Sequence, residues 1–392
     1  MSGRKIVTWA ALIAVVALAA AAGWRGLRSE MDRQRGVDGF EVYLRGKDIC
    51  TLAFEDGVVW AGGIDGLFRL ERVRAEDVTG GRSGRNGSES TEPQSGNSVG
   101  GRSGKPASES SAADDGNSIG GSASYTVSEV GDFRQVKAVL ATEEGLWIGH
   151  DAGLSLLRGG SIRTMTTADG LPDDRVNALC LDAEGKLWAG TWGGAAIVDD
   201  GQVEKVLRTA DGLADDMVNV IFGDSSGSVW LGSYVAPRGG LTVINGAKMQ
   251  SFSTQNGLLH ANINAIMETS EKHVLVGGGL YTKGGGTFFT IDDGTWTVAS
   301  SIRKEDGLAG EKIRALFRDH RGRIWIGSEY DGLVVLENLS VDASGVAGFV
   351  ARRLLTQENG LPNNEVKVVG ESETGDIWVG TRSGLLKIEE GG

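Results

Sequence analysis

The residues best suited to binding chemistry lie in loops that follow a recurring Trp-x-Gly sequence. An aromatic face beside a charged group offers apolar area and hydrogen bonds to a sugar ring or to a polar protein surface. We therefore predict a ligand-binding surface, although ordinary exposed loops would show the same composition. From these loops the predicted binding residues are His150, Trp192, Tyr234, Arg238, Tyr281, Lys283, Glu329, Tyr330 and Arg382.

A second set of polar residues precedes the repeated apolar segments, and His260 joins the predicted binding surface from this set. Acidic pairs such as Asp173-Asp174 and Asp215-Asp216 have the oxygen ligands that calcium prefers. They come from separate repeats, however, and Asp is a common turn residue, so we expect them to shape turns. The sequence predicts neither a metal site nor a cofactor.

These loops must be positioned by a repeating element of the chain. Aligning on the Trp-x-Gly core gives seven units, the fifth having Leu in place of Trp, and successive anchors from the second unit onward are 41, 42, 45, 50 and 53 residues apart. Such periods are typical of four short strands with turns. The anchors are Trp60, Trp147, Trp188, Trp230, Leu275, Trp325 and Trp378.

In the third unit, segments 176–182, 187–191, 195–198 and 203–208 each predict a strand, separated by turns rich in Asp and Gly. Four antiparallel strands make one blade, and its two apolar faces must be covered by neighbouring blades. We expect the Trp to fill the space between blades. The predicted fold is therefore all-β, a seven-bladed β-propeller over residues 39–392.

The two ends of the repeat region predict how the ring closes. The last unit ends in its third strand, 385–388, while the alternating segment 40–44 precedes the first unit. We predict that this N-terminal strand completes the last blade, because an unpaired sheet edge would otherwise remain.

Two segments fall outside the repeat pattern. Residues 1–25 contain an apolar run from Ile6 to Ala22, which predicts one N-terminal hydrophobic helix that acts either as an uncleaved membrane anchor or as a cleaved signal peptide. Arginines follow the run, so the orientation stays open. Residues 26–38 are predicted to be a juxtamembrane linker. Residues 76–124, rich in Ser and Gly, are predicted to be a disordered insertion in the first blade.

Composition excludes one class of partner. The net charge is −13 and the pI is near 4.9, whereas nucleic-acid binding requires a basic face. Cys50 and Cys180 lie in apolar segments and are expected to be buried and unpaired.

The repeated phrases DGLPDDRVNALCLDAEGKLWAGTWGG, DGLAGEKIRALFRDHRGRIWIGSEYDGL and NGLPNNEVKVVGESETGDIWVGTRSGL resemble the two-component regulator propeller repeat. The resemblance implies a ligand-binding sensor held outside the cytoplasm, in the periplasm or at the cell membrane, which recognises an oligosaccharide or another small extracellular ligand. The chain ends four residues after its last predicted strand. We therefore expect signal output through a separate partner such as a histidine kinase.

Two alternatives to the sensor remain. One is a protein-interaction scaffold that uses the same rim of loops. The other is a metal-dependent lyase or a hydrolase, since some propellers are lyases with His and a metal at the channel mouth. His150 and His260 are the candidates for that role, but the sequence contains no third ligand at a recognisable spacing, so we predict no catalytic residues.

Overall fold

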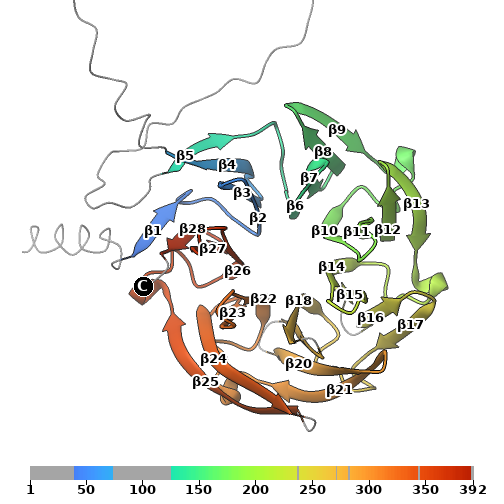
Figure 1. Ribbon diagram of the computed structural model, residues 1–392, viewed down its shortest axis with the longest axis vertical. Helices are drawn as coiled ribbons and strands as arrows, with labels where there is room; N and C mark the ends of the chain where they lie inside the picture. Colours follow the sequence, from blue (N-terminus) through green and yellow to red (C-terminus); the bar gives the residue numbers. More distant parts are fainter. Residues whose placement is uncertain are drawn as a thin grey trace, which may run out of the picture.

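The computed structural model describes residues 39–73, 125–235, 238–270, 272–280, 283–342 and 345–389. These residues form seven four-stranded antiparallel sheets arranged as a ring. The predicted seven-bladed propeller is confirmed (Figure 1). The predicted N-terminal helix, the linker and residues 76–124 of the insertion lie outside the described residues. Within the described residues, no helix has the length and apolar character needed to cross a membrane.

Blades are numbered in chain order, and the strands within a blade are called first to fourth from the centre of the ring outward. Blade 1 contains β2 (Thr51–Glu55), β3 (Val58–Gly63), β4 (Gly66–Arg72) and β5 (Tyr125–Glu129). Blade 2 contains β6 (Ala138–Thr142), β7 (Gly145–His150), β8 (Gly153–Arg158) and β9 (Ser161–Met165). Blade 3 contains β10 (Val176–Leu181), β11 (Leu187–Thr191), β12 (Gly194–Asp199) and β13 (Gln202–Leu207). Blade 4 contains β14 (Val218–Gly223), β15 (Val229–Ser233), β16 (Leu241–Asn245) and β17 (Lys248–Phe252).

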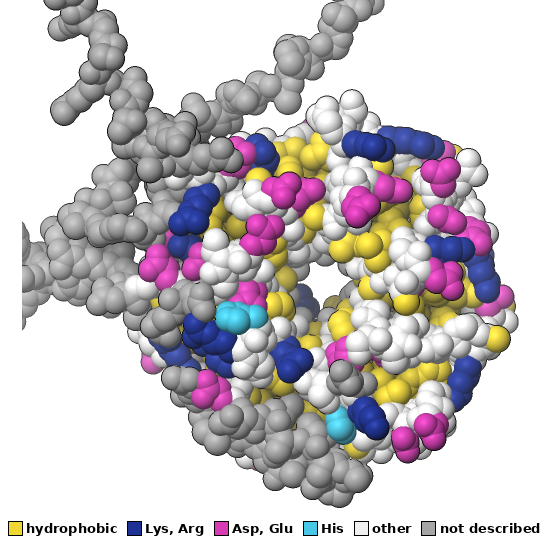
Figure 2. Space-filling view, in the orientation of Figure 1, with side chains coloured by type: hydrophobic (Ala, Val, Ile, Leu, Met, Phe, Trp, Pro, Cys, Tyr) yellow, Lys and Arg dark blue, Asp and Glu magenta, His cyan; other side chains and the backbone are white. Residues whose placement is uncertain are grey.

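Blade 5 contains β18 (Ile263–Ser270), β19 (His273–Leu280), β20 (Lys283–Asp292) and β21 (Thr295–Ile302). Blade 6 contains β22 (Ile313–Arg318), β23 (Ile324–Ser328), β24 (Leu333–Asp342) and β25 (Gly345–Leu355). Blade 7 contains β26 (Val366–Glu371), β27 (Ile377–Thr381), β28 (Gly384–Ile388) and β1 (Phe40–Tyr43). Single-turn 3-10 helices precede four of the first strands: η1 (Thr167–Asp169), η2 (Thr209–Asp211), η3 (Lys304–Asp306) and η4 (Gln357–Asn359). First strands line the centre of the ring, whose opening is visible in Figure 2.

The repeated Trp fills the space between blades, as predicted. Trp230 is fully buried in a cluster that joins Val243 of blade 4 to Ile263 and Phe289 of blade 5. Its indole N–H donates to Asp224, 2.7 Å away, and Asp182 and Asp319 accept the same bond from the Trp of blades 3 and 6. These aspartates also cap the turn after the first strand, so one carboxylate fixes both the turn and the Trp.

The Gly of the Trp-x-Gly core marks the closest approach between blades. A Cβ built on Gly190 would lie 2.7 Å from Val218 Cγ1 of blade 4, closer than real Cβ contacts come. The equivalent Gly of every blade faces a Val or Ile at the entry to the first strand of the next blade, which is either the first residue of that strand or lies two residues before it. The pairs, in order round the ring, are Gly62 with Val136, Gly149 with Val176, Gly190 with Val218, Gly232 with Ile263, Gly277 with Ile313, Gly327 with Val366 and Gly380 with Ile49.

Ring closure follows the prediction. Strand β1 pairs antiparallel with β28, from Phe40 opposite Ile388 to Tyr43 opposite Leu385. The backbone N–H of Glu389 donates to Gly39, 3.0 Å away, so both ends of the ring lie together. The buried Lys387 ammonium forms ion pairs with Glu41 of β1 at 3.5 Å and with Asp376 at 3.7 Å. Closure therefore combines a strand ladder, apolar packing of Phe40 and a buried charge cluster.

We predict that deleting residues 40–45 lowers the free energy of unfolding by about 3–5 kcal/mol, because it exposes the β28 edge and the apolar groups under Phe40. Thermal and denaturant unfolding measure the change. Deleting six residues within 80–100 is the control. Equal effects of the two deletions would contradict the closure.

We predict that Gly190→Ala destabilises the ring by about 1–3 kcal/mol, because the added methyl group overlaps Val218. A double-mutant cycle with Val218→Ala tests this cause. Removing the Val218 methyl groups relieves the overlap, so the double variant should be more stable than the sum of the two single effects predicts. Strict additivity would show that the close contact is not the reason.

Candidate functional site

The two sets of polar loops lie on one rim of the ring. Backbone N–H groups in the loops that join second and third strands donate to the loops that enter first strands: Tyr234 to Met217 at 3.1 Å, Glu329 to Lys312 at 3.2 Å and Arg382 to Glu365 at 3.2 Å. We call this side the entry rim. The opposite side, formed by the turns that join first to second and third to fourth strands, is called the turn rim.

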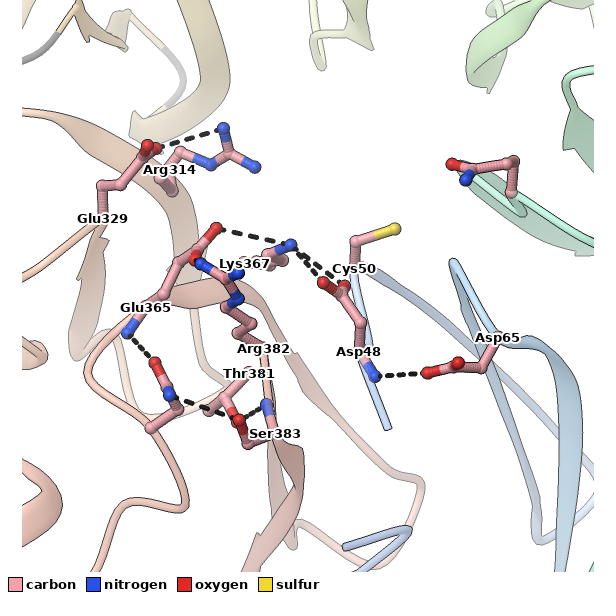
Figure 3. A network of polar contacts seen from close by, with 12 residues as sticks. Asp48, Cys50, Asp65, Arg314, Glu329, Glu365, Lys367, Thr381, Arg382 and Ser383 are labelled. Carbon is pink, nitrogen blue, oxygen red and sulfur yellow. Dashed lines mark hydrogen bonds and ion pairs between the residues drawn. The ribbon is translucent and has the colours of Figure 1, made fainter. Parts of the chain in front are cut away.

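A charged network lies at the entry-rim mouth of the channel, between blades 7 and 1 (Figure 3). Lys367 Nζ of β26 donates to both carboxylate oxygens of Asp48, at 2.7 and 3.0 Å, and lies 3.3 Å from Glu365. Asp48 precedes β2, and its backbone N–H donates to Asp65 at 3.0 Å. The Lys367 and Asp48 side chains are 10% and 12% exposed, so this pair is well shielded from solvent.

A second ion cluster lies on blade 6. Glu329 Oε2 is 2.7 Å from the Lys312 ammonium and 3.2 Å from Arg314 of β22. The Tyr330 hydroxyl donates to the other carboxylate oxygen at 3.1 Å. Burial alone would raise the pKa of Glu329, but the bond to Lys312 and the charge of Arg314 outweigh it and hold that pKa below its usual value.

Exposed aromatic side chains stand on the same rim. Tyr330 is 58% exposed, Trp192 40% and Tyr234 37%. The Arg175 guanidinium lies 4.2 Å from the centre of the Trp192 ring, and a bond to Asp173 holds it there. This cation–π contact leaves the other ring face of Trp192 to a ligand.

The two histidines predicted for this surface have structural partners. His150 is buried, its Nε2 lies 2.8 Å from Ser155 Oγ, and its Nδ1 accepts the Ala152 N–H at 3.2 Å. Burial lowers the pKa of His150. We withdraw His150 from the predicted binding surface, because both ring nitrogens are engaged below it.

His260 forms a turn. Its Nδ1 accepts the Asn262 N–H at 2.9 Å, the bond that Asp173, Asp215 and Asn363 make in other blades. Burial lowers the pKa of His260, and nearby Lys312 adds to the effect. His260 thus stands in for a turn carboxylate or amide and requires a neutral ring.

The remaining predicted residues have different positions. Arg382 is 68% exposed and lies 3.6 Å from Glu365, which joins it to the network. Arg238 is exposed in the blade 4 loop, and Lys283 is exposed at the start of β20. Tyr281 lies outside the described residues. The structure therefore joins Glu329 to Tyr330 on blade 6 and Arg382 to Glu365 on blade 7, while Trp192 and Tyr234 face solvent on blades 3 and 4.

The acidic pairs shape turns, as expected. Asp173 accepts the Arg175 N–H at 2.9 Å, and Asp174 accepts the Thr167 N–H of η1 at 2.7 Å. Asp215 and Asp216 repeat both bonds in blade 4. Across the described ranges, no group of three or more His, Cys, Asp or Glu side chains has metal-site geometry.

Sequence reasoning missed Asp48, Arg314, Glu365 and Lys367. A signal for two of them was present in the repeat. Arg314 and Lys367 stand where blades 3, 4 and 5 have Asn177, Asn219 and Asn264. A charged residue at a position where other repeats have Asn could have been recognised as a candidate functional residue.

Two cavities of the described structure lie on the turn rim. One of about 490 Å³ is lined by residues including Phe222, Glu268, Phe317, His320 and Glu371. Another of about 380 Å³ shares His320 and Glu371 and reaches Phe54. Both are open, shallow hollows at the other end of the channel, which the sequence did not predict.

The repeat pattern described as "Two component regulator propeller" matches residues 170–193 and 307–330. Two blades therefore carry the two-component regulator propeller repeat. The matched segments hold Trp192, Glu329 and Tyr330 together with the turn aspartates. A comparison with curated proteins finds no match.

Solved structures with the same fold include extracellular domains of proteins assigned to hybrid two-component systems. The domain of BT3049, assigned to a hybrid two-component system of B. thetaiotaomicron, is 17% identical with a TM-score of 0.61, over 90% of this chain and 41% of that one. The corresponding domain of BT4673 is 16% identical with a TM-score of 0.56, over 90% and 40%. This chain thus spans about two fifths of their length.

Enzymes share the fold as well. Virginiamycin B lyase from Staphylococcus aureus, as a catalytically inactive variant with quinupristin, is 10% identical with a TM-score of 0.54, over 89% of this chain and 98% of that one. At these identities the likeness shows the fold alone.

We predict that Glu329→Gln lowers the free energy of unfolding by about 2 kcal/mol at pH 7, because it leaves the buried Lys312 ammonium without its partner. The folded-state pKa of Glu329 is below the unfolded value, so its contribution is complete above the unfolded pKa and disappears as pH falls through the folded pKa. The difference from the wild type should therefore shrink as the pH falls from 7 to below the usual Glu pKa of about 4.3. Denaturant unfolding across this range measures it, with Glu144→Gln in an exposed turn as control. A pH-independent difference would contradict the ion-pair account.

Proposed function

We propose that this protein is the ligand-binding sensor propeller of an extracytoplasmic signalling system. It binds an oligosaccharide on the entry rim, does not change it chemically, and passes the signal to a separate membrane partner such as a histidine kinase. One observation carries the proposal: three solvent-exposed aromatic side chains share this rim with a shielded network of carboxylates and cations.

The physical basis is the mixed surface of a sugar ring. Its C–H face packs on an aromatic ring, and its hydroxyl groups both donate and accept hydrogen bonds. Tyr330 beside Glu329 and Arg314 supplies one such combination, and Trp192 held by Arg175 supplies another. Binding sites combine apolar contact with a few fixed polar groups, and both clusters meet this description.

A binding role without catalysis agrees with the histidine geometry. The only two histidines of the chain that sequence reasoning placed near the entry rim each hold part of the fold: His150 through Ser155 and His260 through the Asn262 turn. A general base must reach the substrate, and the buried His150 does not. We therefore propose no enzymatic activity for this rim.

The position of the chain ends supports a direction for signalling. Strand β1 begins and β28 ends at the turn rim, where Gly39 and Glu389 are hydrogen-bonded. Residues 1–25, which we propose as a membrane anchor or signal peptide, join the ring from that side through the proposed linker 26–38. If residues 1–25 act as a membrane anchor, the entry rim would face away from the membrane, toward incoming ligand.

A protein-binding scaffold is the second candidate. In the part of the chain that the structure describes, four of the eight exposed large hydrophobic side chains lie on the entry rim: Ile64, Trp192, Tyr234 and Tyr330. Aromatic residues of this kind are enriched at protein interfaces. Such a partner would use the same rim and would appear as a stoichiometric protein on purification.

We predict that the full-length protein binds oligosaccharides on a glycan array, and that Trp192→Ala and Tyr330→Ala each weaken binding about tenfold through loss of ring stacking. Isothermal titration calorimetry with the best array ligand measures the affinity. Leu181→Ala is the matched control, because Leu181 is 38% exposed at the turn-rim end of β10. All variants should keep the wild-type melting temperature.

The outcomes separate the candidates. Unchanged affinity in both aromatic variants would remove the entry rim as the sugar site. Absence of any glycan signal together with a co-purifying protein would favour the scaffold. Turnover of a bound glycan would contradict the non-catalytic role.

A further inference from the structure

One position of the repeat lies at the innermost edge of every blade. It is the residue that directly follows the Val or Ile in contact with the core Gly of the preceding blade. In blades 3 to 7 the strand register shifts at this residue, so that it has no partner in the ladder. The seven residues are Cys50, Lys137, Asn177, Asn219, Asn264, Arg314 and Lys367.

In four blades this residue forms a hydrogen bond to the next blade. The side-chain amides of Asn177, Asn219 and Asn264 donate to Val218, Ile263 and Ile313 carbonyl oxygens at 3.1, 2.8 and 3.1 Å. The Cys50 thiol donates to the Val136 carbonyl at 3.2 Å. A short polar side chain at this position is therefore sufficient for the hydrogen bond between neighbouring blades.

Three blades depart from this rule, and all three carry a cation. Lys137 of blade 2 donates to the neutral amide of Gln135 at 2.8 Å, whereas Arg314 and Lys367 pair with carboxylates of the entry rim. A long charged side chain costs more to order and desolvate than an Asn. Blades 3, 4 and 5 bond to their neighbours at this position through an uncharged Asn. The cations of blades 2, 6 and 7 therefore need an explanation other than contact between blades.

The three cations gather in one sector of the channel mouth. Blades 7 and 2 flank blade 1, and blade 6 lies beyond blade 7. The Cys50 thiol of blade 1 donates to the carbonyl of Val136, the residue before Lys137, and Lys367 binds Asp48, two residues before Cys50. Burial raises the pKa of the Cys50 thiol, and the positive charges of Lys137, Lys367 and Arg314 oppose this rise. Figure 3 shows Arg314, Lys367 and Cys50 around one space.

Carboxylates balance this sector only in part. The cations are Lys137, Lys312, Arg314, Lys367 and Arg382, and the carboxylates are Asp48, Asp65, Glu329 and Glu365. Among these cations Lys137 bonds to a neutral amide, that of Gln135, in a chain whose net charge is −13. Cations in a shielded mouth attract an anion more strongly than surface cations do.

We propose that the channel mouth between blades 6 and 2 binds the anionic group, a carboxylate or a sulfate, of an acidic oligosaccharide. The inference rests on the proposed sugar-binding function and specifies its ligand class. Lys137 and Arg314 contact the anion, and Lys367, held by Asp48, contributes its charge. The exposed aromatic side chains of the rim bind the remaining sugar rings of the oligosaccharide.

The test uses a glycan array that contains uronate-bearing, sulfated and neutral oligosaccharides. Calorimetry then compares the strongest acidic ligand with its methyl-esterified or desulfated counterpart. The decisive variant is Lys137→Asn/Arg314→Asn, because Asn is the residue that blades 3, 4 and 5 use at this position and Glu329 keeps its pair with Lys312. Lys205→Asn, which removes an exposed charge from β13, is the matched control.

We expect the double variant to lose about tenfold to a hundredfold in affinity for the acidic ligand, while the control keeps it. The uncharged counterpart should bind wild type and double variant alike. Uronate and sulfate arms of the array identify which anion is preferred. If the double variant fails to fold, Lys137→Gln, which removes the charge of the least paired cation, serves with an expected loss of about tenfold.

Each result is decisive. Binding of neutral glycans alone would overturn the anion site and leave the proposed sensor function standing. Acidic ligands bound equally by the wild type and the double variant would place the anion elsewhere and also overturn it. Failure of every glycan to bind would refute the proposed function itself.

Discussion

Contact between each Gly of the Trp-x-Gly core and the first Val or Ile of the next blade is the constraint on which this structure depends. The contact has no room for a Cβ, and it recurs seven times, from Gly62 with Val136 to Gly380 with Ile49. A blade is apolar on both faces and cannot be stable alone. The glycine lets neighbours approach closely enough for the Trp to fill the remaining space, and the circle closes only if every junction keeps the same spacing.

The last junction has a double role. Gly380 meets Ile49 there, and the residue before Ile49 is Asp48, which binds Lys367 of blade 7. These two residues are 319 positions apart in the chain. Closing the ring therefore also assembles part of the candidate site, because the two halves of the charged network arrive from opposite ends of the repeat region. The closing strand pair β1 and β28 holds both halves in register on the outside of the same blade.

Much of the fold could be predicted, because the repeats share local signals: a Gly for the close approach in all seven, a Trp for the gap in six, and an Asp that fixes turn and Trp in blades 3, 4 and 6. The site was predicted only in part. Glu329, Tyr330 and Arg382 follow the Trp-x-Gly core and were found through their position, whereas Lys367 was not, because it lies inside an apolar strand pattern. His150 has the sequence signature of an exposed loop residue, but Ser155 and Phe133 enclose it.

The sequence by itself determined the number of blades, the order of their strands and the pairing of the chain ends, because these features follow from local spacing and from the need to cover apolar faces and sheet edges. Tertiary structure alone decided which polar residues meet. Lys137, Arg314 and Lys367 belong to three different blades, and only the curvature of the closed ring brings them to the sector of the channel mouth that contains Cys50. Spacing along the chain does not predict this convergence. The convergence depends on the angle between neighbouring blades, and side-chain packing sets that angle.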